Sequence, residues 1–136
     1  MLKTQLIHPE LMGLLAHCGH GDKILIADGN YPLATETGDA AKVYLGLCPG
    51  LPTVTQVLDA VMSVVRIERV ESMSPCDGRT PEIFADYRER FGDMPIEELS
   101  RYDFYAAGAD PKVRIAISTG EKRFYADLIL TIGVTF

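Results

Sequence analysis

The sequence has few of the residues that mark nucleic-acid-binding and disulfide-rich proteins. Its 13 lysines and arginines are outnumbered by 19 aspartates and glutamates, which gives a formal net charge of -6. Without a basic cluster the chain cannot displace counterions from a phosphate backbone, so we expect no nucleic-acid partner. The three cysteines, Cys18, Cys48 and Cys76, are odd in number and widely spaced. They predict no disulfide framework.

Long apolar runs are also missing. No segment approaches the roughly 18 apolar residues that a membrane span requires. The amino-terminal stretch lacks the apolar run and small-residue cleavage site of a secretory signal. We therefore expect no membrane partner and a cytoplasmic location.

Common cofactor and metal motifs are absent or incomplete. His17, Cys18 and His20 lie close together, but no second cluster supplies further ligands at a metal-binding spacing, so no metal is expected. Gly19-His20-Gly21 begins like a dinucleotide fingerprint, yet it lacks the third glycine and precedes its strand. No phosphate-binding loop, nucleophile elbow or zinc-protease helix is present. The sequence gives no reason to expect a cofactor.

What is present is the pattern of one globular α/β domain spanning residues 1–136, with 47% hydrophobic and 24% charged residues. Apolar spacing and capping residues predict helices over 9–17, 52–65, 80–91 and 101–107, with Thr53 and Thr80 as caps. Apolar runs predict strands over 23–28, 42–47, 66–73, 113–118 and 128–134. Residues 96–99 fit either type. This alternation predicts a three-layer α/β/α domain with a mainly parallel or mixed sheet.

The last predicted strand, 128–134, is not followed by a helix. Such a strand is expected at an edge of the sheet or against another subunit. Closed oligomers are the usual way in which soluble proteins cover these surfaces.

Several side chains are candidates for chemistry. His20 lies between two glycines, and its unperturbed pKa of about 6.5 suits proton transfer. Asp28 ends a buried strand, where open α/β sheets place ligand contacts. Phenols at Tyr102, Tyr105 and Tyr125 and guanidinium groups at Arg101 and Arg123 suit hydroxyl-rich ligands. Each also has a structural alternative, since a loop histidine is often a surface or capping group, an aspartate before Gly-Asn often caps its turn, and spaced aromatics often belong to the core.

Taken in order, short segments along the chain give a more specific indication. They are Gly19-His20-Gly21-Asp22, Ile26-Ala27-Asp28 with Pro32, Thr119-Gly120-Glu121, Tyr125-Ala126, Ile129-Leu130 and Gly133-Val134. This ordered set resembles the D-ribose pyranase and L-fucose mutarotase family, and the likeness runs from Pro9 to Phe136.

The resemblance implies a cofactor-free enzyme that interconverts the cyclic forms of a monosaccharide, in an α/β protein that assembles as a homo-oligomer, a decamer. By position, His20 would be the proton donor and Asp28 a sugar ligand. Tyr125, Ala126 and Asp127 would form the carboxyl-terminal arm of the pocket.

Three further positions follow from the same resemblance. Arg101 would contact the sugar, Tyr105 would be a second acid-base group, and Glu68 would be an acidic sugar contact. Arg101 and Tyr105 resemble the L-fucose type, since the D-ribose type more usually has histidine and lysine there. A D-ribose pyranase, a non-catalytic sugar-binding or transport-accessory protein and a ligand-free structural oligomer are the alternatives.

Two features qualify this assignment. The family motif is usually Tyr-x-Asn, whereas Asp127 ends it here, and an ionised carboxylate only accepts hydrogen bonds. A straight strand over residues 22–28 would also separate His20 from Asp28 by about 20 Å. Either the loop folds back, or the pocket forms where one subunit's loop meets another's strand end. We favour the second arrangement.

Overall fold

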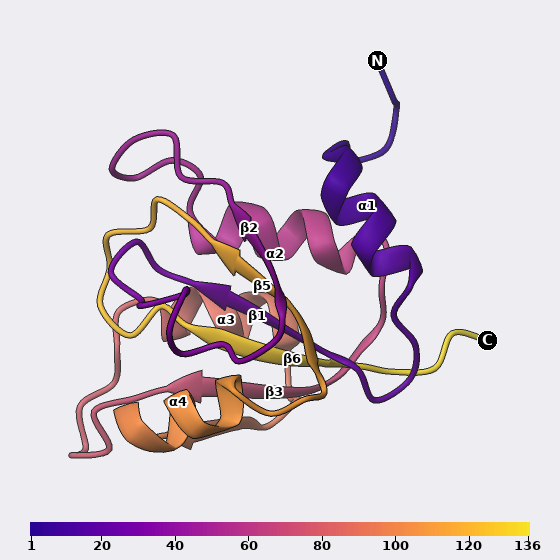
Figure 1. Cartoon of the computed structure of the whole chain (residues 1–136). Coiled ribbons are helices and arrows are strands. Elements are labelled where there is room, and N and C mark those ends of the chain that lie inside the picture. Colours follow the sequence, from indigo (N-terminus) through magenta and orange to yellow (C-terminus); the bar gives the residue numbers. More distant parts are fainter.

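The computed structural model describes all 136 residues, and its centre is one six-stranded mixed sheet (Figure 1). The strands lie in the order β2-β5-β1-β6-β3-β4. Their bounds are β1 (Lys23–Ala27), β2 (Ala41–Tyr44), β3 (Ile67–Met73), β4 (Ile96–Leu99), β5 (Val113–Ser118) and β6 (Leu128–Ile132). Only β6 runs antiparallel to its neighbours, so the other strands all end at one edge of the sheet.

Helices cover both faces of this sheet. They are α1 (Pro9–Ala16), α2 (Val54–Met62), α3 (Phe84–Phe91) and α4 (Arg101–Gly108). Apolar residues of α1, α2 and α3 join the larger core on one face, and α4 packs with the 31–40 loop in the smaller core on the other. Figure 1 shows α2 and α3 behind the sheet and α4 in front of it. The predicted three-layer α/β/α architecture is confirmed. None of the helices is long and apolar enough to cross a membrane.

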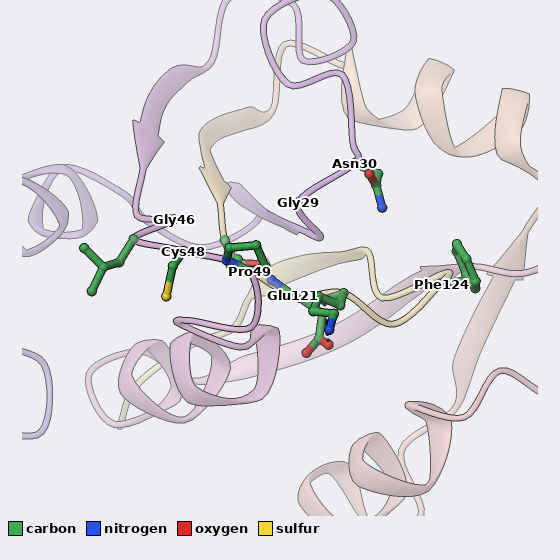
Figure 2. A pocket seen from close by; sticks show the side chains of 11 residues that line it. Gly29, Asn30, Gly46, Cys48, Pro49, Glu121 and Phe124 are labelled. Atoms are coloured by element: carbon green, nitrogen blue, oxygen red, sulfur yellow. Dashed lines mark hydrogen bonds between the residues drawn. The ribbon is translucent and has the colours of Figure 1, made fainter.

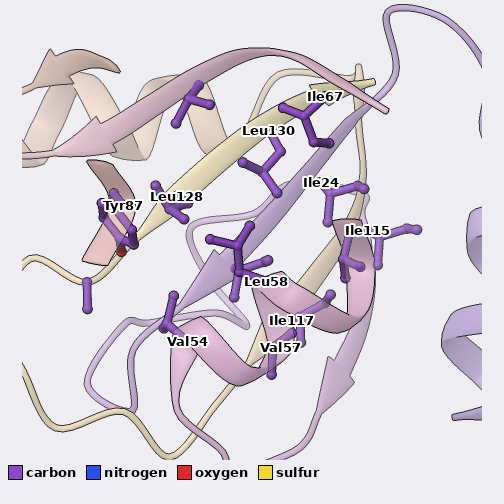
Figure 3. Packing of buried hydrophobic residues seen from close by; sticks show 14 of the residues in the cluster. Ile24, Val54, Val57, Leu58, Ile67, Tyr87, Ile115, Ile117, Leu128 and Leu130 are labelled. Carbon is purple, nitrogen blue, oxygen red and sulfur yellow. The ribbon is translucent and has the colours of Figure 1, made fainter. Parts of the chain in front are cut away.

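Helix α2 shows how the pattern produces the larger core. Thr53 caps the helix, as the sequence predicts, and the structure adds a reciprocal capping box with Gln56. Val54, Val57 and Leu58 then repeat at helical spacing and are buried. Figure 3 shows these three side chains pointing toward the sheet, where the larger core includes Ile24, Ile117, Leu128 and Leu130.

The expectation for the last strand is wrong. β6 lies between β1 and β3 in the middle of the sheet, and all five of its residues are buried. It needs no following helix because the chain turns after β5 through residues 119–127 and returns antiparallel. The edges are instead β2 and β4, which are short strands with partly exposed residues.

The third helix also begins later than predicted. Thr80 and Pro81 lie outside the helix, Glu82 and Ile83 form a turn before it, and the Phe84 N–H donates to the Pro81 carbonyl. Helix α3 therefore starts at Phe84, after Ile83, which gives no side-chain cap. The ambiguous residues 96–99 are the edge strand β4, paired in parallel with β3.

Candidate functional site

A cavity of about 590 Å³ opens at the edge where the parallel strands end. Asp28 follows β1, Met73 ends β3, Arg101 and Tyr105 come from α4, and Asp127 precedes β6. The remaining lining residues are Asn30, Tyr31, Phe124 and Tyr125. We call this the carboxyl-end cavity. Its position is the one at which open α/β sheets bind ligands.

Two carboxyl groups lie side by side in this cavity. The Asp28 N–H donates to Oδ1 of Asp127 at 2.8 Å, and the Asn30 N–H donates to Oδ1 of Asp28 at 2.8 Å. Asp28 and Asp127 are only 6% and 2% exposed. Burial, followed by the nearby Asp28 carboxylate, raises the pKa of Asp127 well above its usual range, and burial also raises the pKa of Asp28.

Phenol groups line the same cavity. The rings of Tyr31 and Tyr105 meet edge to face with centroids 5.5 Å apart, and the Tyr31 hydroxyl donates to the Glu36 carbonyl at 3.2 Å. Burial raises the pKa of both tyrosines, although Arg101 opposes the rise at Tyr105. Both hydroxyls therefore keep their protons at neutral pH. Gly108 permits this packing, because a Cβ there would lie 3.0 Å from the Tyr31 hydroxyl.

The 125–127 segment presents alternate residues to opposite sides of the sheet. Tyr125 and Asp127 line the carboxyl-end cavity, whereas the Ala126 side chain is fully buried in the larger core. Only the backbone of Ala126 is therefore placed to meet a ligand in the cavity. Tyr125 has a φ of 59°, a left-handed conformation that is uncommon for an aromatic residue and often marks a functional constraint.

His20 and Glu68 lie at the opposite end of the sheet. The His20 Nε2 is 3.0 Å and 3.2 Å from the two carboxylate oxygens of Glu68. Both side chains are largely exposed, at 58% and 44%. His20 lines a separate hollow of about 450 Å³ that includes Val64, Gly133 and Val134 and shares no residue with the carboxyl-end cavity.

The placement of the candidate residues thus divides into two groups. Asp28, Arg101, Tyr105, Tyr125 and Asp127 meet in one cavity of the chain. The His20–Glu68 pair is separated from them by the length of β1, and the loop does not fold back. Within one subunit His20 and Asp28 do not share a pocket, as the strand length predicts.

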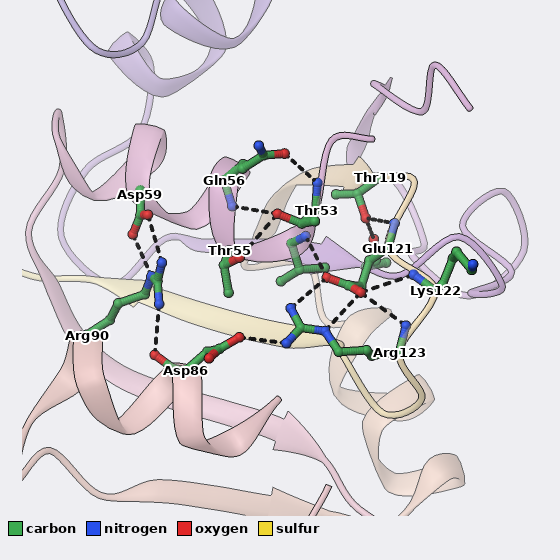
Figure 4. Close-up of polar contacts among 12 residues, drawn as sticks. Thr53, Thr55, Gln56, Asp59, Asp86, Arg90, Thr119, Glu121, Lys122 and Arg123 are labelled. Atoms are coloured by element: carbon green, nitrogen blue, oxygen red, sulfur yellow. Dashed lines mark hydrogen bonds and ion pairs between the residues drawn. The ribbon is translucent and has the colours of Figure 1, made fainter. Parts of the chain in front are cut away.

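A polar network that sequence reasoning missed anchors the loop bearing Tyr125 and Asp127. Glu121, which is only 4% exposed, accepts from the guanidinium of Arg123, and Arg123 Nη1 donates to Asp86 of α3 at 2.6 Å. Figure 4 shows this chain of contacts beside the Asp59–Arg90 pair that joins α2 to α3. Arg123 is thus held in ion pairs rather than directed at the cavity.

The network also sets the charge of its central carboxylate. Burial alone would raise the pKa of Glu121, but hydrogen bonds from Arg123 outweigh it and lower that pKa. Thr119-Gly120-Glu121 belongs to the ordered motifs of the sequence. However, its partner Asp86 lies 37 residues from Arg123 in the chain, so no local pattern could indicate the pair.

A second hollow of about 490 Å³ adjoins the carboxyl-end cavity and shares Asn30 and Phe124 with it. Figure 2 shows its wall, which includes Gly29, Gly46 and Cys48. A Cβ at Gly120 would lie 2.6 Å from the Cys48 carbonyl. The loop that contains Gly120 can therefore approach the loop that contains Cys48 only because residue 120 has no side chain. Its only ionisable carboxylate, Glu121, is already paired with Arg123. The carboxyl-end cavity is therefore the better candidate for acid-base chemistry.

Comparison with known proteins identifies the family. A family model described as the RbsD / FucU transport protein family matches residues 1–135. The chain belongs to this family. A D-ribose pyranase of Geobacillus kaustophilus is 35% identical over 136 residues, covering 100% of this chain and 96% of the relative. The resemblance indicated by the ordered motifs is confirmed.

Solved structures of RbsD/FucU proteins share this fold. Bacillus subtilis RbsD, in complex with D-ribose, has a TM-score of 0.86 and 31% identity, and the match covers 100% of each chain. A fucose mutarotase from Streptococcus pneumoniae, in complex with L-fucose, has a TM-score of 0.80 and 29% identity, covering 96% of this chain and 95% of the other. Both branches of the family are thus similar to this chain over nearly its full length.

Proposed function

We propose that this RbsD/FucU protein is an isomerase that interconverts the anomers or ring forms of a monosaccharide without a cofactor. The observation that carries the proposal is the carboxyl-end cavity, in which two carboxyl groups, a guanidinium and phenols converge at the strand ends. Relatives whose names describe ring-form or anomer interconversion support the same chemistry.

The cavity offers the groups that this reaction requires. Opening a cyclic sugar needs a proton delivered to the ring oxygen and another removed from the anomeric hydroxyl. Such acid-base catalysis contributes typically about 10²–10⁴-fold, which suits a reaction that proceeds slowly in water. Tyr105 keeps its proton and serves as a donor, Asp28 accepts from a sugar hydroxyl, and Arg101 offers forked donors to neighbouring hydroxyls.

We propose that His20 completes the cavity of a neighbouring subunit. Its imidazole is exposed, paired only with Glu68, and remote from the cavity of its own chain. Val64 and Val134 beside it are 41% and 49% exposed, which leaves apolar surface for a second copy to cover. In a homo-oligomer, a decamer by family resemblance, each site would then combine His20 of one subunit with Asp28 and Tyr105 of another.

The proposed sugar is of the L-fucose type, because Arg101 and Tyr105 occupy the positions that distinguish the fucose branch. D-ribose is the second candidate. It is favoured by the D-ribose pyranase relative and by the higher TM-score of the ribose complex.

Proton NMR magnetisation exchange tests the proposal directly. Native protein should accelerate exchange between the anomers or ring forms of L-fucose or D-ribose, and His20→Ala should abolish the acceleration. His17→Ala is the matched control, since the hydrogen bond of the His17 ring is with the Gly13 carbonyl of its own helix. Unchanged exchange rates with native protein, for both sugars, would reject the enzyme. A sugar-dependent rise in melting temperature without accelerated exchange would instead indicate a sugar-binding or transport-accessory protein.

A further inference from the structure

The buried carboxyl pair in the carboxyl-end cavity has no cation to neutralise it. None of the ion pairs in the protein includes Asp28 or Asp127. Arg101 lines the same cavity but pairs with neither carboxyl group. Two ionised carboxylates so enclosed would repel each other and would lose most of their hydration.

The surrounding elements supply no other compensating charge. The titratable groups around the pair are Tyr31, Glu36, Tyr87, Arg101, Tyr105, Tyr125, Glu121 and Arg123. Of the two cations, Arg123 is already paired with Glu121 and Asp86, and Arg101 pairs with neither aspartate. A proton is therefore the simplest neutralising charge.

The geometry of the pair also favours a proton. The Asp28 N–H donates to Oδ1 of Asp127 at 2.8 Å, which holds the buried Asp127 carboxyl beside Asp28. Two ionised carboxylates can only accept, so a bond between them needs one carboxyl to be protonated. Each carboxyl accepts one backbone N–H bond at 2.8 Å, from Asn30 at Asp28 and from Asp28 at Asp127, so these bonds do not choose between them. Asp127 is the more deeply buried of the two, which places the proton there.

We propose that Asp127 carries a proton shared with Asp28 in the resting protein, and that this neutral carboxyl determines specificity by donating to a sugar hydroxyl. When a sugar binds, the Asp127 O–H turns from Asp28 to a sugar hydroxyl, and the pair then offers a donor at Asp127 and an acceptor at Asp28. A pair of adjacent hydroxyls on one sugar face matches that arrangement, since each hydroxyl both donates and accepts. This inference rests on the proposed function and specifies how the cavity recognises its substrate.

The shared proton predicts how sugar binding depends on pH. Above the titration of the pair, both carboxyls are ionised and the donor at Asp127 is lost. If binding requires the proton, KM should rise by about tenfold per pH unit beyond that point. Asp127→Asn keeps a donor of similar shape that does not titrate, so its KM should stay level over the same range. Asp39→Asn, which changes an exposed aspartate, should behave like the native protein.

Two measurements decide the proposal. The first is ¹³C NMR of aspartate labelled at the carboxyl carbon, recorded for native protein and for Asp127→Asn. At neutral pH, native protein should show one signal with the chemical shift of a protonated carboxyl, and the variant should lack this signal. In the second, the rise of KM with pH should disappear in Asp127→Asn. Only ionised carboxyl signals at neutral pH, or the same rise of KM in Asp127→Asn, would overturn it. The NMR titration needs no activity and uses native protein, so a pair that is ionised at neutral pH overturns the proposal even if the variant fails to fold or neither sugar is a substrate.

Discussion

Replacing Glu121 by glutamine should strongly destabilise the fold while changing little of its shape. The carboxylate accepts from the backbone N–H groups of Val54, Lys122 and Arg123 at 3.0–3.3 Å. It also accepts from Nε and Nη2 of the Arg123 side chain, each at 3.1 Å. In glutamine, an NH₂ group replaces one of the two carboxylate oxygens and cannot accept. If it replaces Oε2, which has the fewer donors, the Val54 N–H and Arg123 Nη2 lose their acceptor.

The magnitude follows from the burial of this pair. Breaking a buried ion pair by removing one partner typically costs about 3–5 kcal/mol. Arg123 is 25% exposed and keeps its pair with Asp86, so we expect the low end of this range, about 3 kcal/mol. At about 2–4 °C per kcal/mol for a domain of this size, the melting temperature should fall by roughly 6–12 °C. Differential scanning calorimetry measures this, with Glu89→Gln on the exposed face of α3 as a control expected to change stability by less than about 0.5 kcal/mol.

The pH dependence gives a second check on the same substitution. Because the folded protein lowers the pKa of Glu121, its contribution is present above the unfolded pKa of about 4.3 and is lost as pH falls through the lower folded pKa. The stability difference between native protein and Glu121→Gln should therefore shrink in that acidic window. A loss below about 1 kcal/mol at pH 7, on the scale of an exposed pair, would refute the reasoning.

Three further predictions concern the core, a loop and the carboxyl pair. Leu58→Ala, at a fully buried position of α2, should lower the free energy of unfolding in urea by about 2–5 kcal/mol; a loss under about 1 kcal/mol would contradict the packing. Gly120→Ala should displace the 46–51 loop and be strongly destabilising, because its Cβ would meet two carbonyl oxygens; a native melting temperature would show that the loops do not approach so closely. For the native protein, the raised pKa of Asp127 means that the folded state binds more protons than the unfolded state above a pH of about 3.9. As pH rises from there to the folded pKa of Asp127, the free energy of unfolding should fall by up to about 1.4 kcal/mol per pH unit. Urea titrations of Asp127→Asn should lack this slope, and an identical slope would contradict the assignment.

The local sequence pattern was sufficient to predict a helix or strand whose structure depends on neighbouring residues alone. The spacing of Val54, Val57 and Leu58 behind Thr53 predicted α2 and its buried face, because helical period and capping are properties of neighbouring residues. The position of β6 was not predictable in the same way. An apolar run indicates burial on both faces but does not say which strands lie beside it.

The candidate site shows the same division. Asp28 could be predicted as a ligand contact from its place at a strand end. Its proximity to Asp127, 99 residues later, depends on β1 pairing with β6, and only the family resemblance indicated that both belong to one pocket. No sequence pattern indicated the Arg123–Asp86 ion pair, because the two residues are far apart in the chain and a single sequence does not show which charged residues meet.

The central claim, a sugar mutarotase whose sites combine residues of two subunits, is tested most directly by mixing two inactive variants. His20→Ala and Asp28→Ala would be refolded together and assayed by magnetisation exchange with the preferred sugar. Each variant alone should be inactive, whereas mixed oligomers should regain about a quarter of the native activity, since random assembly pairs an intact His20 with an intact Asp28 at that frequency. If the co-refolded mixture assembles but remains inactive, His20 and Asp28 do not meet across a subunit boundary.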